Sequence, residues 1–445
     1  MKDDLHKETY FEQYITRKLN ELTSGGEWRL SDNDKGFDPN TALYLPDFVE
    51  FMEKTQPEKL EKMQKSFGSN WESNLTRSLV KSLEIEGTVQ TIRNGFSMAG
   101  YATIMCSGGI PDDPRITNAQ RNYDENILRV MRQVHYQTAG NKSLDLVFFI
   151  NGIPVATAEV KTDLTQTVQD AIEEYQNERK PIEPDGRRKN YLLMYKRGAI
   201  VHFAISESEV YMYAGDLGAD KPKFLPFNKG NEGHEGNPPM EDGSDEYPTG
   251  YFWNEICQKE NWIRIFHNFI FEEVKKKEDA TGRLREEKKQ LFPRYHQWDV
   301  VTKVIKDIKT NGVGQKYLIE HSAGSGKTET ISWISHELIR MMNDKGNDRL
   351  FSSVIVVTDR LGLDTNIKGT IKQLKKTVGL IEMVGGDDTH KTAGAKSKQL
   401  AKAIKDKREI IVVTLQTFPF ALEAIAEDDS LKDAKFAVLI DERSE

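Results

Sequence analysis

The sequence has few cysteines, no long apolar runs and no excess of basic charge. The two cysteines among 445 residues, Cys106 and Cys257, lie outside any CxxC or HxxxH pattern, so the sequence excludes a disulfide framework and a cysteine-based zinc site. No apolar run approaches the roughly 18 residues of a membrane helix, and the opening stretch MKDDLHKETYFEQY lacks a secretory signal. We therefore expect a cytoplasmic protein with no membrane partner.

The net charge of −8 excludes a generally basic surface, because attraction to nucleic-acid phosphates comes from basic faces. Any DNA-binding groove must therefore be local. The Lys- and Arg-rich stretch 274–290 is interleaved with acids, which predicts a solvated helix or an interdomain connector rather than a DNA-binding patch.

The length and the 37% share of hydrophobic residues predict two or three domains with real cores. We place a first domain at residues 1–262, with a long surface loop rich in Gly and Pro over 215–250. A helical connector over 263–290 and a last domain over 291–445 follow.

Hydrophobic periodicity predicts a helix over 9–22 and a helical block over about 48–85. Between about 127 and 213, short β-rich runs predict a mixed sheet: ILRVMRQVHY, LDLVFFI, IPVATAEV, NYLLMYKRGAIVHFAI and SEVYMYAG. The aromatic stretch from YFWNEI to FIFEEV restarts an amphipathic helical region. After residue 291, strand-like KYLIEH, VIVVTD, IIVVTL and AVLID alternate with helical segments and predict a parallel sheet.

The runs LDLVFFI and IPVATAEVK flank Asn151 and Gly152, a pair that predicts a type I′ hairpin turn. Regular pairing outward from this turn puts Asp145 and Glu159 on opposite faces of the hairpin. One inserted residue, a β-bulge that Pro154 favours, would bring both carboxylates to the same face.

Two carboxylates and a lysine at the end of an apolar hairpin predict a Mg²⁺ site, because charges near a core are costly unless they are paired or bind a metal. Asp145 and Glu159 would supply carboxylate oxygens, and the Val160 carbonyl would complete the set. Lys161 would orient or help to deprotonate the water that attacks a phosphodiester. The alternative is a charged, solvent-facing hairpin end with a Lys–Glu surface pair.

The hairpin resembles the core of PD-(D/E)xK nucleases, and the chain resembles the R (restriction and motor) subunits of type I restriction endonucleases. Besides LDLVFFINGIPVATAEVKT, the resemblance rests on TIRNGFSMAGY from residue 91, FLPFNKGNEGHEGNPP, and PRYHQ from residue 293. It implies that Glu12 of the first helix assists the site. It also implies a Gln-xxx-Tyr element after the lysine, but QTVQDAIEEYQNER departs from that spacing and leaves Gln169 and Tyr175 as candidates.

The motif GSGKT follows the apolar run YLIEH and precedes the helical pattern ETISWISHELI. A helix amino terminus behind such a loop binds phosphates through backbone N–H groups, which predicts an ATP site. The lysine would reach the β and γ phosphates and the threonine would bind Mg²⁺. The alternative is an ordinary Gly-rich turn, since His321 stands where the strict pattern has its first glycine. The candidate ATP-binding residues of the loop are Gly324, Ser325, Gly326, Lys327 and Thr328.

The segments around this loop resemble superfamily 2 helicases, which implies a first RecA-like motor lobe. Gln297 stands where those proteins read adenine, and VIVVTDR (354–360) and VVTLQTF (412–418) resemble strand-end motifs that grip DNA phosphates. Asp441 would hold Mg²⁺ through water, and Glu442 would polarise the attacking water. The family continues DEAH where this chain reads DERSE and stops, so we expect an incomplete lobe that hydrolyses ATP poorly.

These patterns predict an α/β protein in which a restriction-endonuclease-like mixed-sheet nuclease domain precedes a RecA-like P-loop lobe with a parallel sheet. The resemblance implies a type I site-specific deoxyribonuclease that uses Mg²⁺ and ATP on unmodified double-stranded DNA, with methyltransferase and specificity subunits as partners. The alternatives are a nonspecific nuclease-helicase of DNA repair, a truncated DNA-binding or assembly module, and a small-molecule kinase, which leaves the hairpin acids unexplained.

Overall fold

The computed structural model divides the chain into two compact units, which we describe separately. The amino-terminal unit holds residues 1–111 and 116–270, and the carboxyl-terminal unit holds residues 112–115 and 271–445. The structure describes residues 8–21, 27–113, 115–164, 166–241, 243–278, 284–322, 324–343, 346, 348–358, 381–384, 393–419, 431 and 433–441. No helix within these ranges is both long and apolar enough to cross a membrane.

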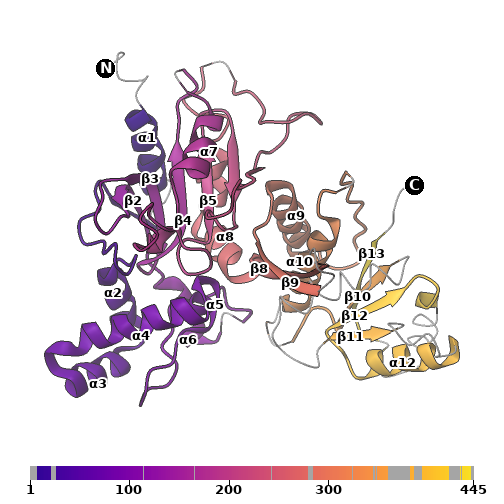
Figure 1. The fold of residues 1–445 in the computed structure, drawn as a ribbon. Coiled ribbons are helices and arrows are strands. Elements are labelled where there is room, and N and C mark those ends of the chain that lie inside the picture. Colours follow the sequence, from indigo (N-terminus) through magenta and orange to yellow (C-terminus); the bar gives the residue numbers. More distant parts are fainter. Residues whose placement is uncertain are drawn as a thin grey trace. The chain divides into compact units, whose positions relative to one another are not determined.

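The amino-terminal unit is built on a seven-stranded sheet whose strands lie in sequence order (Figure 1). Two neighbouring pairs, β1 with β2 and β4 with β5, are parallel, and the other pairs are antiparallel, as expected for a mixed sheet. All of β4 and nearly all of β3 are buried, which fits their almost unbroken apolar sequences. The strands are β1 (Trp28–Ser31), β2 (Leu128–His135), β3 (Ser143–Ile150), β4 (Ile153–Val160), β5 (Val201–Ile205), β6 (Val210–Tyr213) and β7 (Leu225–Pro226).

Helices precede and interrupt this sheet where the apolar spacing predicts them. The helix expected over 9–22 is α1 (Glu8–Glu21), and the block expected over 48–85 holds α2, α3 and α4. The strand expected to start near residue 190 is wrong in its first part, where a short 3-10 helix, Tyr191–Leu193, precedes a tight turn at Gly198. The other elements before β5 are α2 (Leu45–Thr55), α3 (Pro57–Phe67), α4 (Trp71–Ile85), α5 (Thr88–Asn94), α6 (Thr117–Asp124) and α7 (Val168–Asn177).

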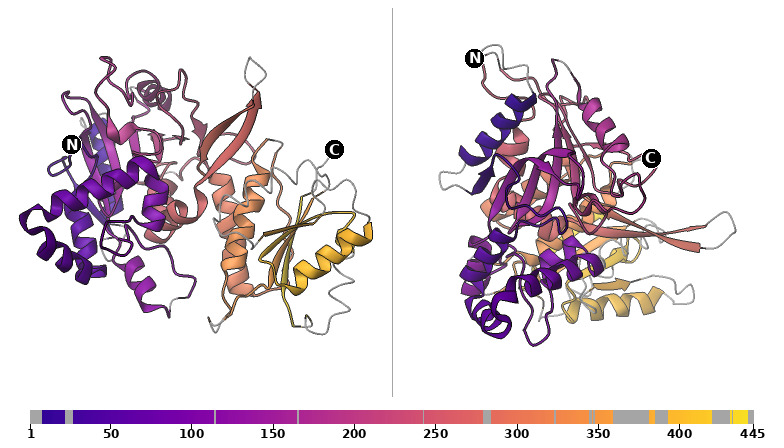
Figure 2. Two further views of the ribbon diagram at one scale, coloured as in Figure 1. Left: turned by 60° about the horizontal axis from the view of Figure 1, so that its bottom comes forward. Right: turned by 60° about the vertical axis from the view of Figure 1, so that its left-hand side comes forward.

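Helices cover both faces of the central strands. In the right-hand view of Figure 2, α1 and α7 lie on opposite sides of the sheet. On the α7 face, a core that includes Val147, Phe149 and Tyr175 is fully buried. On the other face, Phe148 packs edge-on against Trp28, which continues into the aromatic residues of the helical segments 252–256, 259–264 (α8) and 265–269.

The charged stretch that we expected to form a helical connector is a β-hairpin. The strands β8 (Phe271–Glu278) and β9 (Leu284–Leu291) pair antiparallel, so the helix predicted over 274–290 is wrong. In the register of this pair, Lys275 stands opposite Glu287 and Lys276 opposite Glu286. The domain boundaries proposed from composition stay a prediction.

The carboxyl-terminal unit contains the expected parallel sheet. Its strand order is β11-β12-β10-β13, and every neighbouring pair is parallel. Two helices, α9 and α10, pack against each other, and α10 also packs against β10 and β13. The elements are α9 (Tyr295–Asn311), α10 (Lys327–Arg340), β10 (Ser353–Thr358), β11 (Ile381–Val384), α12 (Ala393–Lys405), β12 (Ile410–Thr414) and β13 (Phe436–Asp441).

The strand that we predicted over KYLIEH is wrong. Residues 312–322 form neither helix nor strand, and Leu318 is 86% exposed. An apolar run becomes a strand only where a sheet edge pairs with it, and among the described residues β13 forms one edge of the sheet with β10 as its sole partner. The Tyr317 hydroxyl instead donates a hydrogen bond to Asp307 at the end of α9 (2.7 Å).

Candidate functional sites

The β3–β4 hairpin brings the predicted carboxylates together through one inserted residue. Asn151 and Gly152 have φ angles of 48° and 72°, as a type I′ turn requires. Next to the turn the pairing is regular, but it then shifts, so that Val155 has no partner on β3. The shifted register, continued by one residue, puts Asp145 opposite Glu159. The predicted bulge is confirmed.

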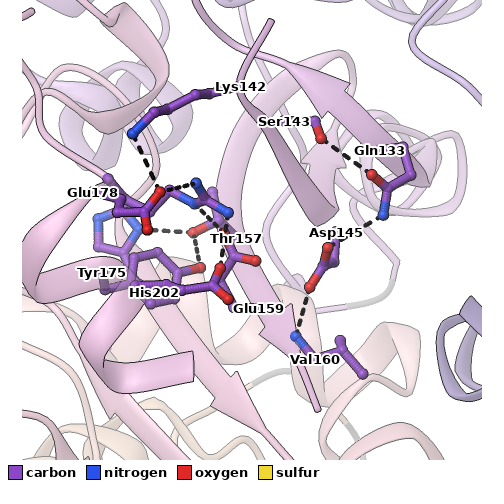
Figure 3. A network of polar contacts seen from close by, with 12 residues as sticks. Gln133, Lys142, Ser143, Asp145, Thr157, Glu159, Val160, Tyr175, Glu178 and His202 are labelled. Carbon is purple, nitrogen blue, oxygen red and sulfur yellow. Dashed lines mark hydrogen bonds and ion pairs between the residues drawn. The ribbon is translucent and has the colours of Figure 1, made fainter. Parts of the chain in front are cut away.

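Asp145 lies at the start of β3 and accepts hydrogen bonds from two sides. One oxygen, Oδ2, accepts from the backbone N–H of Val160 (2.8 Å), and Oδ1 accepts from the side-chain amide of Gln133 (3.2 Å), as Figure 3 shows. Asp145 is 9% exposed. The carboxylate is therefore held against the main chain of β4, beside Glu159.

Glu159 is fully buried, and among the described residues only one of its two carboxylate oxygens has a hydrogen-bond donor. Its Oε1 accepts a hydrogen bond from Arg179, which follows α7, whereas its Oε2 is buried and has no hydrogen-bond partner in the part of the chain that the structure describes. Burial, followed by the nearby charge of Asp145, raises the pKa of Glu159 well above its usual range, and Arg179 opposes this shift. An unpaired carboxylate oxygen in a core is costly, and a bound cation would offset that cost.

Lys161 follows β4 and is tied to carboxylates from both helices that flank the sheet. Its ammonium group contacts Glu8 of α1 and lies 2.7 Å from Glu174 of α7. Burial alone would lower the pKa of Lys161, but the hydrogen bonds and charges of Glu174 and Glu8 raise it above its ordinary value. In this state the lysine is a fixed positive charge rather than a base.

Glu12, which the resemblance implied, reaches the same site from α1. Its carboxylate is 1% exposed, accepts a hydrogen bond from Gln133 (3.0 Å) and lies 3.3 Å from the Arg132 guanidinium. Burial, followed by the charge of Asp145, raises the pKa of Glu12 to about 7. The structure therefore places Glu12 within the electrostatic reach of Asp145.

The two candidates from α7 have different positions. Tyr175 is fully buried, and its hydroxyl lies 2.8 Å from the Thr157 hydroxyl, which in turn lies 2.8 Å from Nδ1 of His202 (Figure 3). Gln169 is exposed on the side of α7 that faces away from the buried residues, so the structure does not bring it into this cluster.

Sequence reasoning missed four residues that hold this site, among them Glu8, which contacts Lys161. Arg179 pairs with Glu159 and with Glu174 (2.9 Å), and Glu174 links Arg179 to Lys161. Gln133 on β2 contacts both Glu12 and Asp145. The sequence offered one general indication of such residues, because buried acids need partners. It does not show which element supplies them.

The glycine-rich loop of the carboxyl-terminal unit has the conformation that a phosphate-binding loop needs. Gly324 and Gly326 have φ angles of 75° and 88°, and α10 begins at Lys327. Gln297 of α9 donates from Nε2 to the carbonyls of Ser325 (3.3 Å) and Gly326 (3.0 Å). A Cβ at position 326 would meet this amide at 2.3 Å, and the φ of 88° is strained for any other residue, so the motif favours glycine there.

The candidate Asp441 and the two segments predicted to grip DNA phosphates meet at the carboxyl ends of parallel strands. Thr358 pairs in register with Asp441 on one side and with Thr414 on the other, so all three reach the same sheet edge. Thr328 is half-buried in the first turn of α10, and Asp441 is half-buried at the end of β13. Glu442, the predicted water-polarising residue, lies outside the described residues.

The donor set at the hairpin fits Mg²⁺ better than a metal held by protein alone. Among the described residues, no group of three or more His, Cys, Asp or Glu side chains forms a ready metal cage. Mg²⁺ is commonly held by one or two carboxylates and keeps several waters. Asp145 and Glu159, with its unpaired oxygen, provide that kind of partial site.

Comparisons with known proteins agree with both halves of this description. Residues 26–221 match the family model described as type I restriction enzyme R protein N terminus, and residues 296–444 match the model described as SWI2/SNF2 ATPase. A relative from Methanocaldococcus jannaschii, named as the type I restriction enzyme MjaIXP endonuclease subunit, is 24% identical over 249 residues. That match covers 53% of this chain and 21% of the relative.

The matches therefore relate the first unit to restriction-system proteins and the second unit to ATPases. More narrowly, residues 26–221 are similar to the amino-terminal part of type I restriction enzyme R proteins, the resemblance that the sequence motifs carry.

Proposed function

We propose that this chain is the DNA-cleaving subunit of a type I restriction–modification system, with a restriction-endonuclease-like unit followed by a RecA-like motor lobe. In this proposal the amino-terminal unit hydrolyses phosphodiesters of unmodified double-stranded DNA with Mg²⁺. The observation that carries the proposal is the bulge that aligns Asp145 with Glu159 while leaving one buried Glu159 oxygen without a partner. A solvent-facing hairpin end would not bury these groups.

The residues of the site divide the chemistry between them. Asp145 and Glu159, with the Val160 carbonyl, would hold Mg²⁺, which supplies a positive charge next to the scissile phosphate and favours ionisation of water. Lys161 would stabilise the negative charge that develops on the phosphate, because the paired carboxylates keep it protonated. Glu12 would add a carboxylate near Asp145, and Tyr175 would support the buried side of Glu159.

The carboxyl-terminal unit would bind ATP and contribute to translocation. Backbone N–H groups from Gly324 to Gly326 and the Lys327 ammonium would hold the phosphates, and Thr328 and Asp441 would bind Mg²⁺. Gln297, which touches the loop carbonyls, is in position to couple base recognition to the loop. Methyltransferase and specificity subunits would supply recognition of the target sequence.

The test is cleavage of supercoiled plasmid by the purified chain with Mg²⁺, alone and with the partner subunits and ATP. Lys161→Ala and Asp145→Ala should abolish nicking and cutting, whereas Lys142→Ala, an exposed lysine of the neighbouring segment, should not. Cleavage that needs the partners supports the restriction system over a free repair nuclease. The absence of cleavage in every mixture, with DNA or partner binding retained, would contradict the proposal in favour of an assembly module.

A further inference from the structure

Gln133 has an unusual backbone conformation for a residue inside a strand. Its φ is 51°, a region that residues other than glycine rarely adopt, and its neighbours on β2 keep regular pairs with β3 while Gln133 and Asp145 form none. Non-glycine residues persist in such conformations only where the surrounding structure imposes them, and these positions gather at functional sites.

The side chain of Gln133 connects two carboxylates that belong to different elements. Its Nε2 donates to Oε1 of Glu12 on α1 (3.0 Å) and to Oδ1 of Asp145 on β3 (3.2 Å). Its Oε1 accepts from the Ser143 hydroxyl (3.1 Å). Ionised carboxylates only accept hydrogen bonds, so the serine and the two acids together fix which end of the amide faces the acids.

Neighbouring buried carboxylates repel each other, and a donor that they share offsets this repulsion. The Arg132 guanidinium pairs with the other carboxylate oxygen of Glu12, Oε2, at 3.3 Å. The neutral amide of Gln133 is the one group in the described contacts of these acids that binds both of them.

We propose that Gln133 is a positioning residue that ties Asp145 to Glu12 and so fixes the Asp145 carboxylate where it can bind the divalent cation. This inference rests on the proposed function and deepens it, because it assigns the residue that places the metal-binding carboxylate. Gln133 contacts neither DNA nor the attacking water in this role.

The experiment is direct Mn²⁺ binding to the full chain, measured by titration calorimetry without DNA. Gln133→Leu, which keeps the size and removes the amide, should weaken Mn²⁺ binding about tenfold. Gln133→Asn keeps the amide but is too short to bridge, and asparagine tolerates positive φ better than glutamine does. This second variant should therefore melt at the same temperature as the wild type or higher, and still bind Mn²⁺ several-fold more weakly.

Two controls separate this inference from the proposed function. Ser143→Ala removes only the contact that orients the amide and should weaken binding less than Gln133→Leu. If Asp145→Ala abolishes Mn²⁺ binding but both Gln133 variants leave it unchanged, the proposed role of Gln133 is wrong and the metal site stands. Binding that Asp145→Ala also leaves unchanged would overturn the hairpin metal site, and the role of Gln133 with it.

Discussion

The hairpin site and the glycine-rich loop satisfy their polar groups in different ways. At the hairpin, charges from distant elements are buried and paired with one another, as Glu159 is with Arg179. At the loop, the contacts are neutral hydrogen bonds from Gln297 to main-chain carbonyls, and the segment that leads into the loop is exposed. Removing one partner at the hairpin should therefore lower the free energy of unfolding. Removing one at the loop should instead weaken ligand binding.

The largest effect that this comparison predicts is at Arg179. Arg179→Leu leaves the Glu159 carboxylate buried without a countercharge, which should lower the free energy of unfolding by about 3–5 kcal/mol in EDTA. Urea unfolding followed by circular dichroism measures this loss, and added Mg²⁺ should recover part of it. The control is Arg188→Leu, whose ion pair with Asp185 is exposed and should matter little. Equal losses in both variants would show that burial does not make the Arg179–Glu159 pair important for stability.

The turn that sets the hairpin register should give the next largest effect. Gly152→Ala forces a side chain into positive φ, and its Cβ would meet the Tyr44 carbonyl oxygen at 2.0 Å. We expect a loss of about 2–3 kcal/mol in the free energy of unfolding. Gly186→Ala shares the positive φ but meets nothing within 4 Å, so it should lose about 1 kcal/mol. Similar losses would mean that the backbone of Tyr44 yields easily.

Acid should destabilise the buried hairpin face through His202. Burial lowers the pKa of His202 to about 3 from an ordinary 6.5, so the folded form resists protonation. The stability that this shift contributes is present above pH 6.5 and is lost as the pH falls towards 3, by about 2 kcal/mol between pH 7 and pH 5.

His202→Asn should remove that part of the pH dependence in urea unfolding. The pKa of His321 beside the loop is also lowered by burial, but this side chain is only half-buried, so His321→Asn should flatten the profile less. The reverse order would show that the loop, and not the hairpin face, is the acid-sensitive region.

The smallest effect on stability should come from Gln297. Gln297→Ala frees the carbonyls of Ser325 and Gly326 and should weaken binding of a fluorescent ATP analogue about fivefold, with less than about 1 kcal/mol change in the free energy of unfolding. Gln315→Ala, in the exposed lead-in, is the matched control. A large loss of stability in Gln297→Ala would show that the loop is built like the hairpin.

The sequence could predict what depends on neighbours in the chain. Asn151 and Gly152 identify the turn, Pro154 indicates the bulge, and the glycines of GSGKT predict the loop before α10. It could not predict Arg179 or Gln133, because a buried acid requires a partner without specifying which element supplies it. The errors over 274–290 and 316–321 have the same origin, since whether a local pattern becomes a strand depends on the edge that pairs with it.

The most direct test of the central claim compares two glutamates of one neighbourhood. Plasmid cleavage should be measured with Mg²⁺ for the wild type, for Glu159→Gln and for Glu173→Gln, which alters an exposed carboxylate on α7. Glu159→Gln should lose cleavage at least a hundredfold, by about 3 kcal/mol of activation free energy or more, and Glu173→Gln should cleave at the wild-type rate. Equal rates for the two variants would contradict a nuclease site at the hairpin.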